Sequence, residues 1–413
     1  MTERLDLCAL ADELDRRLAG ADAALAAQFP GERPGRQPVH TVYVPADRYT
    51  AGLPHEWGAR ALATLEEHEP LLRRCLGEDA DDLVSRVRAK LGAEPVEDLR
   101  IDFEDGYGVR DDDTEDRDVE AAASALATSL QDGIAAPFNG IRFKSFEAPT
   151  RRRGLRTLAL FVARLLEDGA GLDGFVVTLP KVTSIDQVEA MVHACVALER
   201  DLGIAAGSLR FEIQVETPQS VLGPDGTVLV ARMLHAGNGR CTALHYGTYD
   251  YSAFCGIAAQ YQSMEHPVAD HAKLVMQVAA AGTGVRLSDG STNVLPVGGP
   301  DDVLDAWRLH LRLVRRSLER GYYQGWDLHP AQLPTRYAAT FGFYRDGLVR
   351  SADRLRRYCD GTASGFLDEP ATARALADFV LRGVECGAVS SAEATGLTGL
   401  DVSRIDDLAR PHR

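Results

Sequence analysis

The sequence contains few cysteines, and none of them form a C-x-x-C pair. Seven are scattered along 413 residues, at Cys8, Cys75, Cys195, Cys241, Cys255, Cys359 and Cys386. An odd number without paired spacing argues against a disulfide framework and against a structural zinc site. We therefore expect the protein to occupy a reducing compartment, the cytoplasm.

Long apolar runs and an excess of basic residues are also missing. No stretch of about 18 consecutive apolar residues occurs, and no apolar signal region follows the charged segment 1–8, which argues against membrane insertion and export. Lys and Arg number 45 against 61 Asp and Glu, a formal net charge of −16. This charge repels phosphate backbones, so we expect a soluble protein with small-molecule partners and with neither a nucleic acid nor a membrane partner.

Three widespread enzyme motifs are absent or misplaced. The sequence has no G-x-x-x-x-G-K-[ST] phosphate loop and no G-x-S-x-G nucleophile turn, which disfavours a nucleoside-triphosphate enzyme and a serine hydrolase. The G-x-G-x-x-G match at 169–174 precedes an expected strand, whereas a dinucleotide cradle follows one. We interpret it as a helix-to-strand turn, so a nicotinamide enzyme is also disfavoured.

Short β-prone runs alternate with helical segments along most of the chain. Turn residues follow each run, and apolar residues at helical spacing lie between most of them. The runs are His40–Val44, Leu99–Phe103, Gly140–Phe143, Phe175–Leu179, Phe211–Pro218, Leu244–Asp250, Gly284–Leu287 and Gly321–Asp327. Eight such units, in a chain that is 45% hydrophobic, are typical of a (β/α)8 TIM barrel, an α/β fold of about 250 residues.

The chain is longer than one barrel, so we expect additions at both ends. We assign residues 1–37 to an N-terminal helical extension and linker, 38–335 to the catalytic barrel, and 336–413 to a C-terminal helical arm. Residues 3–29 predict an amphipathic helix packed on the main body through Leu5, Leu10, Leu14 and Leu18.

An apolar helical stripe in the arm needs a surface to cover it. The stripe consists of Leu376, Phe379, Val380 and Val384. The barrel of a neighbouring subunit is one such surface, and the alternative is that the arm folds back on its own subunit.

Two carboxylates lie where β-prone runs give way to turn residues. Glu216 ends one run and Asp250 ends the next, and a parallel barrel presents its functional groups at the carboxyl ends of its strands. A hard cation such as Mg²⁺, or Mn²⁺ in its place, takes one or two protein carboxylates. We expect a divalent-metal pair here. The alternative is that both are solvated loop acids.

Other charged residues share this position in the expected barrel. Glu104 and Asp105 follow the second strand, where they could orient metal-bound water. Arg142 ends the third strand and could clamp a carboxylate bidentately, although an ion pair with Glu104 is an alternative. Lys144 follows it, and Lys181 follows the fourth strand.

Seven short motifs, in order, resemble those of one family. They are YVPAD (43–47), DFEDG (102–106), IRFK (141–144), LPKVTS (179–184), VET (215–217), GTYD (247–250) and WDLHPAQ (326–332). Together they resemble the citrate lyase β-subunit-like (HpcH/HpaI aldolase) family, which includes malyl-CoA and citramalyl-CoA lyases.

The resemblance implies a role for each matching residue. Glu216 and Asp250 fall on the family's Mg²⁺ ligands, and Arg142 falls on the arginine that binds the carbonyl or carboxylate of the acid. Glu104 and Asp105 fall on the acidic pair near the metal waters. We expect Lys181 among the catalytic residues, and Lys144 and His329 beside Arg142 in binding substrate or cofactor.

The resemblance also implies a shared active site. Members are usually trimers or hexamers in which a carboxyl-terminal segment supplies an aspartate to a neighbour's site. Residues 365–371 resemble that segment, so Asp368 is the candidate general acid/base of a homo-oligomer. The alternative is that Asp368 caps the helix expected near Pro370.

The implied activity is Mg²⁺-dependent cleavage or formation of a carbon–carbon bond. The substrate would be a small hydroxy- or oxo-acid or its coenzyme A thioester. Lys144 departs from the family's asparagine, and the basic cluster at 151–156 suits either coenzyme A phosphates or a solvated helix start. The alternatives are a malate-synthase-like condensing and thioester-hydrolysing enzyme, and a non-catalytic metabolite-binding barrel.

Overall fold

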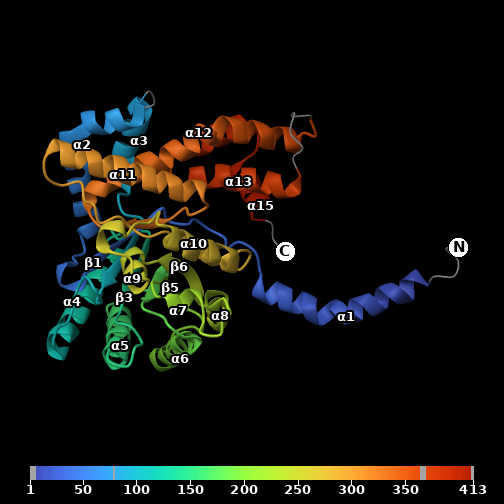
Figure 1. Cartoon of the computed structure of the whole chain (residues 1–413), viewed down its shortest axis with the longest axis horizontal. Coiled ribbons are helices and arrows are strands. Elements are labelled where there is room, and N and C mark those ends of the chain that lie inside the picture. The colour runs from blue at the N-terminus through green and yellow to red at the C-terminus, as the bar shows by residue number, and fades with distance from the viewer. Residues whose placement is uncertain (1–5, 78–79, 363–368, 411–413) are drawn as a thin grey trace.

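The computed structural model describes residues 6–77, 80–362 and 369–410. Eight parallel strands curve into a nearly closed barrel (Figure 1), in the order β7-β6-β5-β4-β3-β2-β1-β8. The strands are β1 (His40–Pro45), β2 (Asp98–Asp102), β3 (Phe138–Arg142), β4 (Phe175–Leu179), β5 (Arg210–Val215), β6 (Cys241–Tyr246), β7 (Arg286–Ser288) and β8 (Gly325–Asp327). An isolated parallel bridge from Ser288 to Gln324 brings the ends of the sheet together. The expected (β/α)8 barrel is confirmed.

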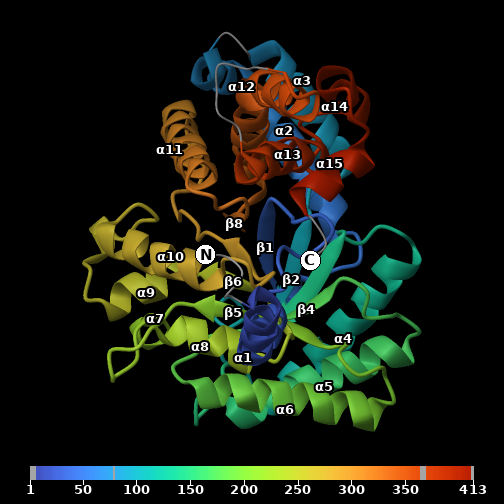
Figure 2. The ribbon, with the colours of Figure 1, turned by 90° about the vertical axis from the view of Figure 1, so that its right-hand side faces the viewer.

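Helices surround most of this barrel. Figure 2 shows α4 to α10 placed around it. The helices up to this point are α1 (Leu7–Gln28), α2 (Leu53–Leu76), α3 (Ala80–Ala93), α4 (Asp112–Gln131), α5 (Arg151–Glu167), α6 (Ile185–Leu202), α7 (Pro218–Val221), α8 (Leu229–Ala236), α9 (Thr248–Phe254) and α10 (Pro267–Ala280). Three short 3-10 turns occupy Ala46–Arg48, Ala259–Tyr261 and Pro330–Gln332.

The remaining helices gather with α2 and α3 on one side of the barrel (Figures 1 and 2). They are α11 (Pro300–Glu319), α12 (Leu333–Cys359), α13 (Pro370–Glu385), α14 (Ser391–Thr398) and α15 (Val402–Ala409). No described helix is long and apolar enough to cross a bilayer.

The interior of the barrel is polar along β2 and β5. Asp98, Arg100 and Asp102 alternate along β2 with the apolar Leu99 and Ile101, and all five side chains are buried. Because successive strand residues point to opposite faces, the charged set lines the barrel interior while the apolar set packs on the surrounding helices. The charged residues therefore pair with one another: Arg100 joins Asp98 to Glu212 of β5.

The apolar stripe of the arm is covered within its own chain. In α13, Leu376 and Val380 are buried, and the ring of Phe379 lies 5.4 Å from that of Phe343 and 5.2 Å from that of Tyr344 on α12. Of the two alternatives, the stripe therefore follows the second, because the long helix α12 of the same chain supplies the surface.

The amino-terminal helix stands away from the body (Figure 1). The sequence correctly predicts a helix, α1, which Asp6 caps through the backbone N–H of Ala9. None of the helix is buried, and Leu10, Leu14 and Leu18 remain about half exposed at 51%, 49% and 51%. The expected packing on the main body is therefore wrong. The apolar spacing indicates that the helix has an apolar face, but it cannot indicate which surface covers that face.

Candidate active site

The barrel brings six of the expected site residues to one end. Parallel strands place all their carboxyl ends on the same face, and the six residues follow those ends. They are Glu104 and Asp105 after β2, Arg142 ending β3, Lys181 after β4, Glu216 directly after β5, and Asp250 in the first turn of α9. Asp250 thus lies on a helix instead of at a strand end, because β6 stops at Tyr246.

Lys181 lies at the centre of this group. Its Nζ donates to Glu104 and Asp105, each at 2.6 Å, and lies 3.4 Å from the carboxylate of Asp250. Its backbone has a φ of 51°, a conformation that costs a non-glycine residue about 1–3 kcal/mol. The backbone N–H donates to Oε1 of Glu216 at 2.7 Å and helps to hold it there. Burial alone would lower the pKa of Lys181, but Glu216 and Glu104 raise it, so the ammonium stays charged.

Glu216 is the most deeply buried carboxylate of the group, with 0% exposure. Its Oε1 accepts the backbone N–H of Lys181, and its Oε2 accepts the side-chain amide of Gln214. Burial raises the pKa of Glu216 to about 8, and repulsion from Glu104 and Asp250 adds to the rise. Such a carboxylate is stabilised in its charged form by a further cation.

The loop after β6 approaches Glu216 closely. A Cβ on Gly247 would lie 2.5 Å from Cβ of Glu216 and 2.9 Å from its Oε2. A side chain at this position would force the ends of β5 and β6 apart. The missing side chain therefore lets α9 start beside Glu216 and brings Asp250 into the group.

Asp102 and Tyr43 hold the guanidinium group of Arg142 in place. Its Nε and Nη2 each donate to Asp102 at 2.7 Å, and its guanidinium lies 4.7 Å from the centre of the Tyr43 ring. The remaining nitrogen, Nη1, lies 3.4 Å from both Gln214 and Glu104. The fork with Asp102 fixes the guanidinium plane and turns Nη1 toward the carboxylates.

The charges at this end are suited to a hard cation. Burial raises the pKa of Glu104, while the ammonium of Lys181 outweighs burial and lowers the pKa of Asp105. Three of the carboxylates, those of Glu104, Asp105 and Asp250, share two cationic side chains. The described residues contain no group of three or more His, Cys, Asp or Glu side chains that could hold a metal ion. Two carboxylates are enough for an open site.

Lys144 and His329, the two further residues expected to bind substrate or cofactor, have hydrogen-bond partners outside this group of six residues. Nζ of Lys144 is buried and donates to Glu115 at 2.6 Å and to the carbonyl of Phe103 at 2.8 Å. These contacts tie the end of β3 to α4. His329 follows β8 and accepts the backbone N–H of Ala331, so it caps the turn that begins at Pro330.

Two of the four arginines in the basic cluster on α5 form ion pairs with α4. Arg153 and Arg156 donate to Asp116 at 2.7 Å and 2.5 Å. Asp368, the expected general acid/base, lies outside the described residues.

Sequence reasoning missed three residues that support the site: Asp102, Gln214 and Tyr43. Asp102 and Gln214 lie on the inward faces of β2 and β5. Each comes two residues before Glu104 or Glu216 in the chain. Polar residues at every second position of an otherwise apolar barrel strand are the signal that could have identified them.

Comparison with solved structures shows the same fold. The chain is similar to the malate synthase of Haloferax volcanii in its magnesium/glyoxylate complex, with a TM-score of 0.50, 15% identity, and coverage of 91% of this chain and 99% of that one. It is also similar to CitE from Mycobacterium tuberculosis in complex with magnesium, acetoacetate and coenzyme A (TM-score 0.46, 18% identity, 86% and 99% covered). An HpcH/HpaI aldolase/citrate lyase family protein from Burkholderia cenocepacia gives a TM-score of 0.41 at 17% identity, with 73% and 91% covered.

Sequence comparison places the chain in a family without assigning it a reaction. No curated protein matches it. A family model described as a domain of unknown function, DUF6986, matches residues 18–413, and the chain therefore belongs to the DUF6986 family.

Proposed function

We propose that the protein is a Mg²⁺-dependent carbon–carbon lyase or aldolase. Its substrate would be a small hydroxy- or oxo-acid or the coenzyme A thioester of one. The observation that carries the proposal is the buried carboxylate of Glu216, which lies with Asp250 and Arg142 at the carboxyl end of the barrel. The seven motifs that resemble the citrate lyase β-like family support it.

Glu216 and Asp250 are the residues that would hold the metal, with Mn²⁺ as a substitute for Mg²⁺. A divalent cation bound there acts as a Lewis acid toward a carboxylate and its adjacent oxygen. Glu104 and Asp105 would accept hydrogen bonds from water beside the cation, while Lys181 keeps these two acids in place.

Arg142 would bind the carbonyl or carboxylate of the acid. Two of its donor atoms are occupied by Asp102, and its Nη1 faces the carboxylate group at the barrel end. A fixed cation at this position stabilises the negative charge that develops as the carbon–carbon bond breaks. Because Asp102 sets the direction of the fork, Nη1 needs no reorientation during the reaction.

A proton must also be moved, and we propose Asp368 of a neighbouring subunit for this step. An aspartate can act as general acid or base when it lies within hydrogen-bond reach of the reacting atom. This assignment requires a homo-oligomer.

A malate-synthase-like condensation followed by thioester hydrolysis is the second candidate. It is favoured by the similarity in fold to the Haloferax volcanii malate synthase, which spans 91% of this chain. Release of free coenzyme A from acetyl-CoA and glyoxylate would distinguish it from cleavage alone.

The direct test is a lyase screen over hydroxyacids and their coenzyme A thioesters, with and without Mg²⁺. We expect at least one substrate to be cleaved with Mg²⁺ and spared after chelation or in a Glu216→Gln variant. Binding of such acids without turnover, by a protein that binds Mg²⁺ normally, would instead identify a non-catalytic metabolite-binding barrel.

A further inference from the structure

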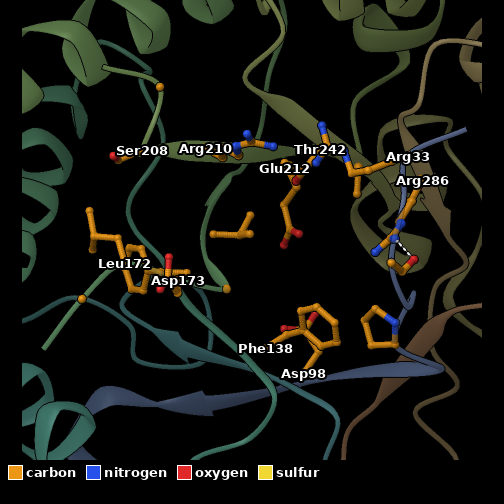
Figure 3. A pocket seen from close by; sticks show the side chains of 18 of the residues that line it. Arg33, Asp98, Phe138, Leu172, Asp173, Ser208, Arg210, Glu212, Thr242 and Arg286 are labelled. Carbon is orange, nitrogen blue, oxygen red and sulfur yellow. Dashed lines mark hydrogen bonds between the residues drawn. The ribbon is translucent and has the colours of Figure 1, made fainter. Parts of the chain in front are cut away.

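A cavity lies at the end of the barrel opposite the carboxylates of Glu104, Asp105, Glu216 and Asp250. It has a volume of about 790 Å³ and is lined by residues at the amino ends of β2 to β7 and by the linker before β1. Asp98 and Glu212 form part of its inner wall (Figure 3). Its size lies within the range of about 300–1,000 Å³ that is usual for small-molecule sites.

Three arginines follow one another along one side of this cavity (Figure 3): Arg210, Arg33 and Arg286. Within the described part of the chain, none of the three forms an ion pair with a carboxylate. Arg286 donates to the backbone carbonyls of Gly35 and Arg36, and so it holds the linker against β7. Arg33 and Arg210 are therefore the two guanidinium groups available to a ligand.

Two other arginines that line the cavity, Arg100 and Arg36, form ion pairs with carboxylates. Arg100, deeper in the same cavity, is neutralised by Asp98 and Glu212, and Arg36 pairs with Glu94 and Glu97. In a chain with 61 acidic and 45 basic residues, most arginines find a carboxylate. Arg33 and Arg210 line the cavity without an ion-pair partner among the described residues, and the overall composition does not explain this.

The lowered pKa values of Arg33 and Arg286 agree with positive charges that lie close together. Burial lowers the pKa of Arg33, and repulsion from Arg210 lowers it further. Burial also lowers the pKa of Arg286 to about 10, with repulsion from Arg33 and Arg382 in the same direction. An anion between these groups would remove the repulsion, because an opposite charge favours the charged form of each arginine.

The opposite side of the cavity is different in character. Phe138 and Leu172 supply apolar surface, and Asp173 lies beside Leu172. Thr242 lies between Arg210 and Arg33, and Ser208 lies on the other side of Arg210 (Figure 3). The cavity thus has a basic side for an oxyanion and an apolar side for an organic group.

We propose that this cavity is a binding site for a phosphorylated small molecule, whose phosphate lies between Arg33 and Arg210 while its organic part contacts Phe138 and Leu172. Guanidinium forks match phosphate oxygens in geometry and charge. The site is separate from the proposed catalytic end, since the length of the barrel lies between them.

Calorimetric titration of the full chain with sodium pyrophosphate tests the proposal. The buffer contains EDTA and little salt, so that neither Mg²⁺ nor screening interferes. We expect saturable binding of one pyrophosphate, weakened at least about tenfold by Arg33→Gln and by Arg210→Gln, because each removes charged hydrogen bonds. Arg210 is exposed, so its replacement leaves the core intact, and melting curves confirm folding.

Two control variants locate the binding. Arg200 is an exposed arginine that pairs with Asp201 at the end of α6, and Arg200→Gln should leave the affinity within about twofold, since exposed pairs contribute little. Arg142→Gln removes the cation at the other end. The proposal is overturned if pyrophosphate does not bind, if Arg200→Gln weakens it as much as Arg210→Gln, or if only Arg142→Gln abolishes it. Tighter binding of citrate than of pyrophosphate would overturn the assignment to phosphate.

Discussion

The carboxylate of Glu216 is removed from solvent and lies near other acids, and we propose that this combination favours the binding of a cation. Burial raises its pKa to about 8, with Glu104 and Asp250 adding repulsion. Gln214 and the backbone of Lys181 hold its two oxygens in place. A cation that binds here therefore meets a preoriented ligand.

Replacing Glu216 by Gln should lower the affinity for Mg²⁺ or Mn²⁺ by more than about 100-fold. Even changes in groups that only orient a metal ligand cost about 10- to 100-fold, and here the charge of the ligand itself is lost. Isothermal titration of wild type and variant measures the change.

A matched control is available at the other end of the barrel. Glu199 is also buried, and it forms a two-point ion pair with Arg240. Glu199→Gln should leave the metal affinity unchanged. Equal affinities of the Glu216→Gln protein and wild type would show that Glu216 is not a ligand.

Arg142→Lys should lower kcat by about 10²–10³-fold, although the positive charge is kept. A lysine ammonium cannot form the two-point contact with Asp102 and also direct a donor toward the carboxylates. The loss corresponds to one preorganised donor to a developing negative charge. Steady-state kinetics with the substrate found in the screen measures it.

The same exchange at Arg240 serves as the control. Arg240 binds Glu199 through two donors, at 2.6 and 2.8 Å, so Arg240→Lys breaks an equivalent fork outside the site and should retain turnover. If Arg142→Lys also turns over at the wild-type rate, Arg142 has only a structural role.

The sequence predicted the residues that follow the strand ends, but not the supporting residues within the strands. Glu104 and Glu216 were identifiable because each follows a β-prone run, which in a barrel is the functional end. Asp102 and Gln214 lie inside the runs, where only a period of two distinguishes an inward polar residue from an outward apolar one. The contact of Lys144 with Glu115 was not predictable, because it depends on how α4 packs.

At the scale of elements, packing partners were harder to predict than the elements themselves. Helices α1 and α13 both form where the apolar spacing indicates them. One of them has no buried residue, and the other is covered by α12. A stripe of apolar residues predicts that a helix has an apolar face. It does not predict which surface packs against that face, because this depends on where the linkers place the helix.

A buried polar cluster joins α11 to the barrel, and we expect it to make stability depend on pH. His310 of α11 lies 3.1 Å from the carboxylate of Asp327 on β8 and 2.8 Å from the hydroxyl of Thr335 on α12. Arg336 and His40 also contact Asp327. Burial lowers the pKa of His310 below its ordinary value of 6.5.

The folded state therefore disfavours protonated His310. Its contribution to the free energy of unfolding is fully present above pH 6.5. It is lost as the pH falls below that value, because the unfolded chain then binds the proton more readily. The loss is up to about 1.4 kcal/mol per pH unit. We expect His310→Gln to reduce the difference between unfolding free energies at pH 5.5 and 7.5, measured with guanidinium chloride. An unchanged difference would exclude His310 as the titrating group.

At the scale of the whole molecule, the position of α13 bears on how Asp368 could act. This helix begins at Pro370, and Ala371 and Arg374 lie near the end of α10 and the amino end of β7. The carboxylates lie at the other end of the strands, and β5 alone, with six residues, spans about 20 Å. Asp368 lies outside the described residues, and we propose that it acts on such a site in a second copy of the chain.

Mixing two inactive variants, Asp368→Asn and Glu216→Gln, tests this arrangement. Each variant should lose most of its activity alone, because one lacks the proposed general acid/base and the other a metal ligand. In a mixed oligomer, an intact Asp368 from one subunit meets an intact Glu216 from the other, so part of the activity should return. Activity is measured after subunit exchange, and native mass spectrometry of differently tagged chains measures how much mixed oligomer has formed. A monomeric protein, an active Asp368→Asn variant, or mixed oligomers without activity would each contradict a shared site.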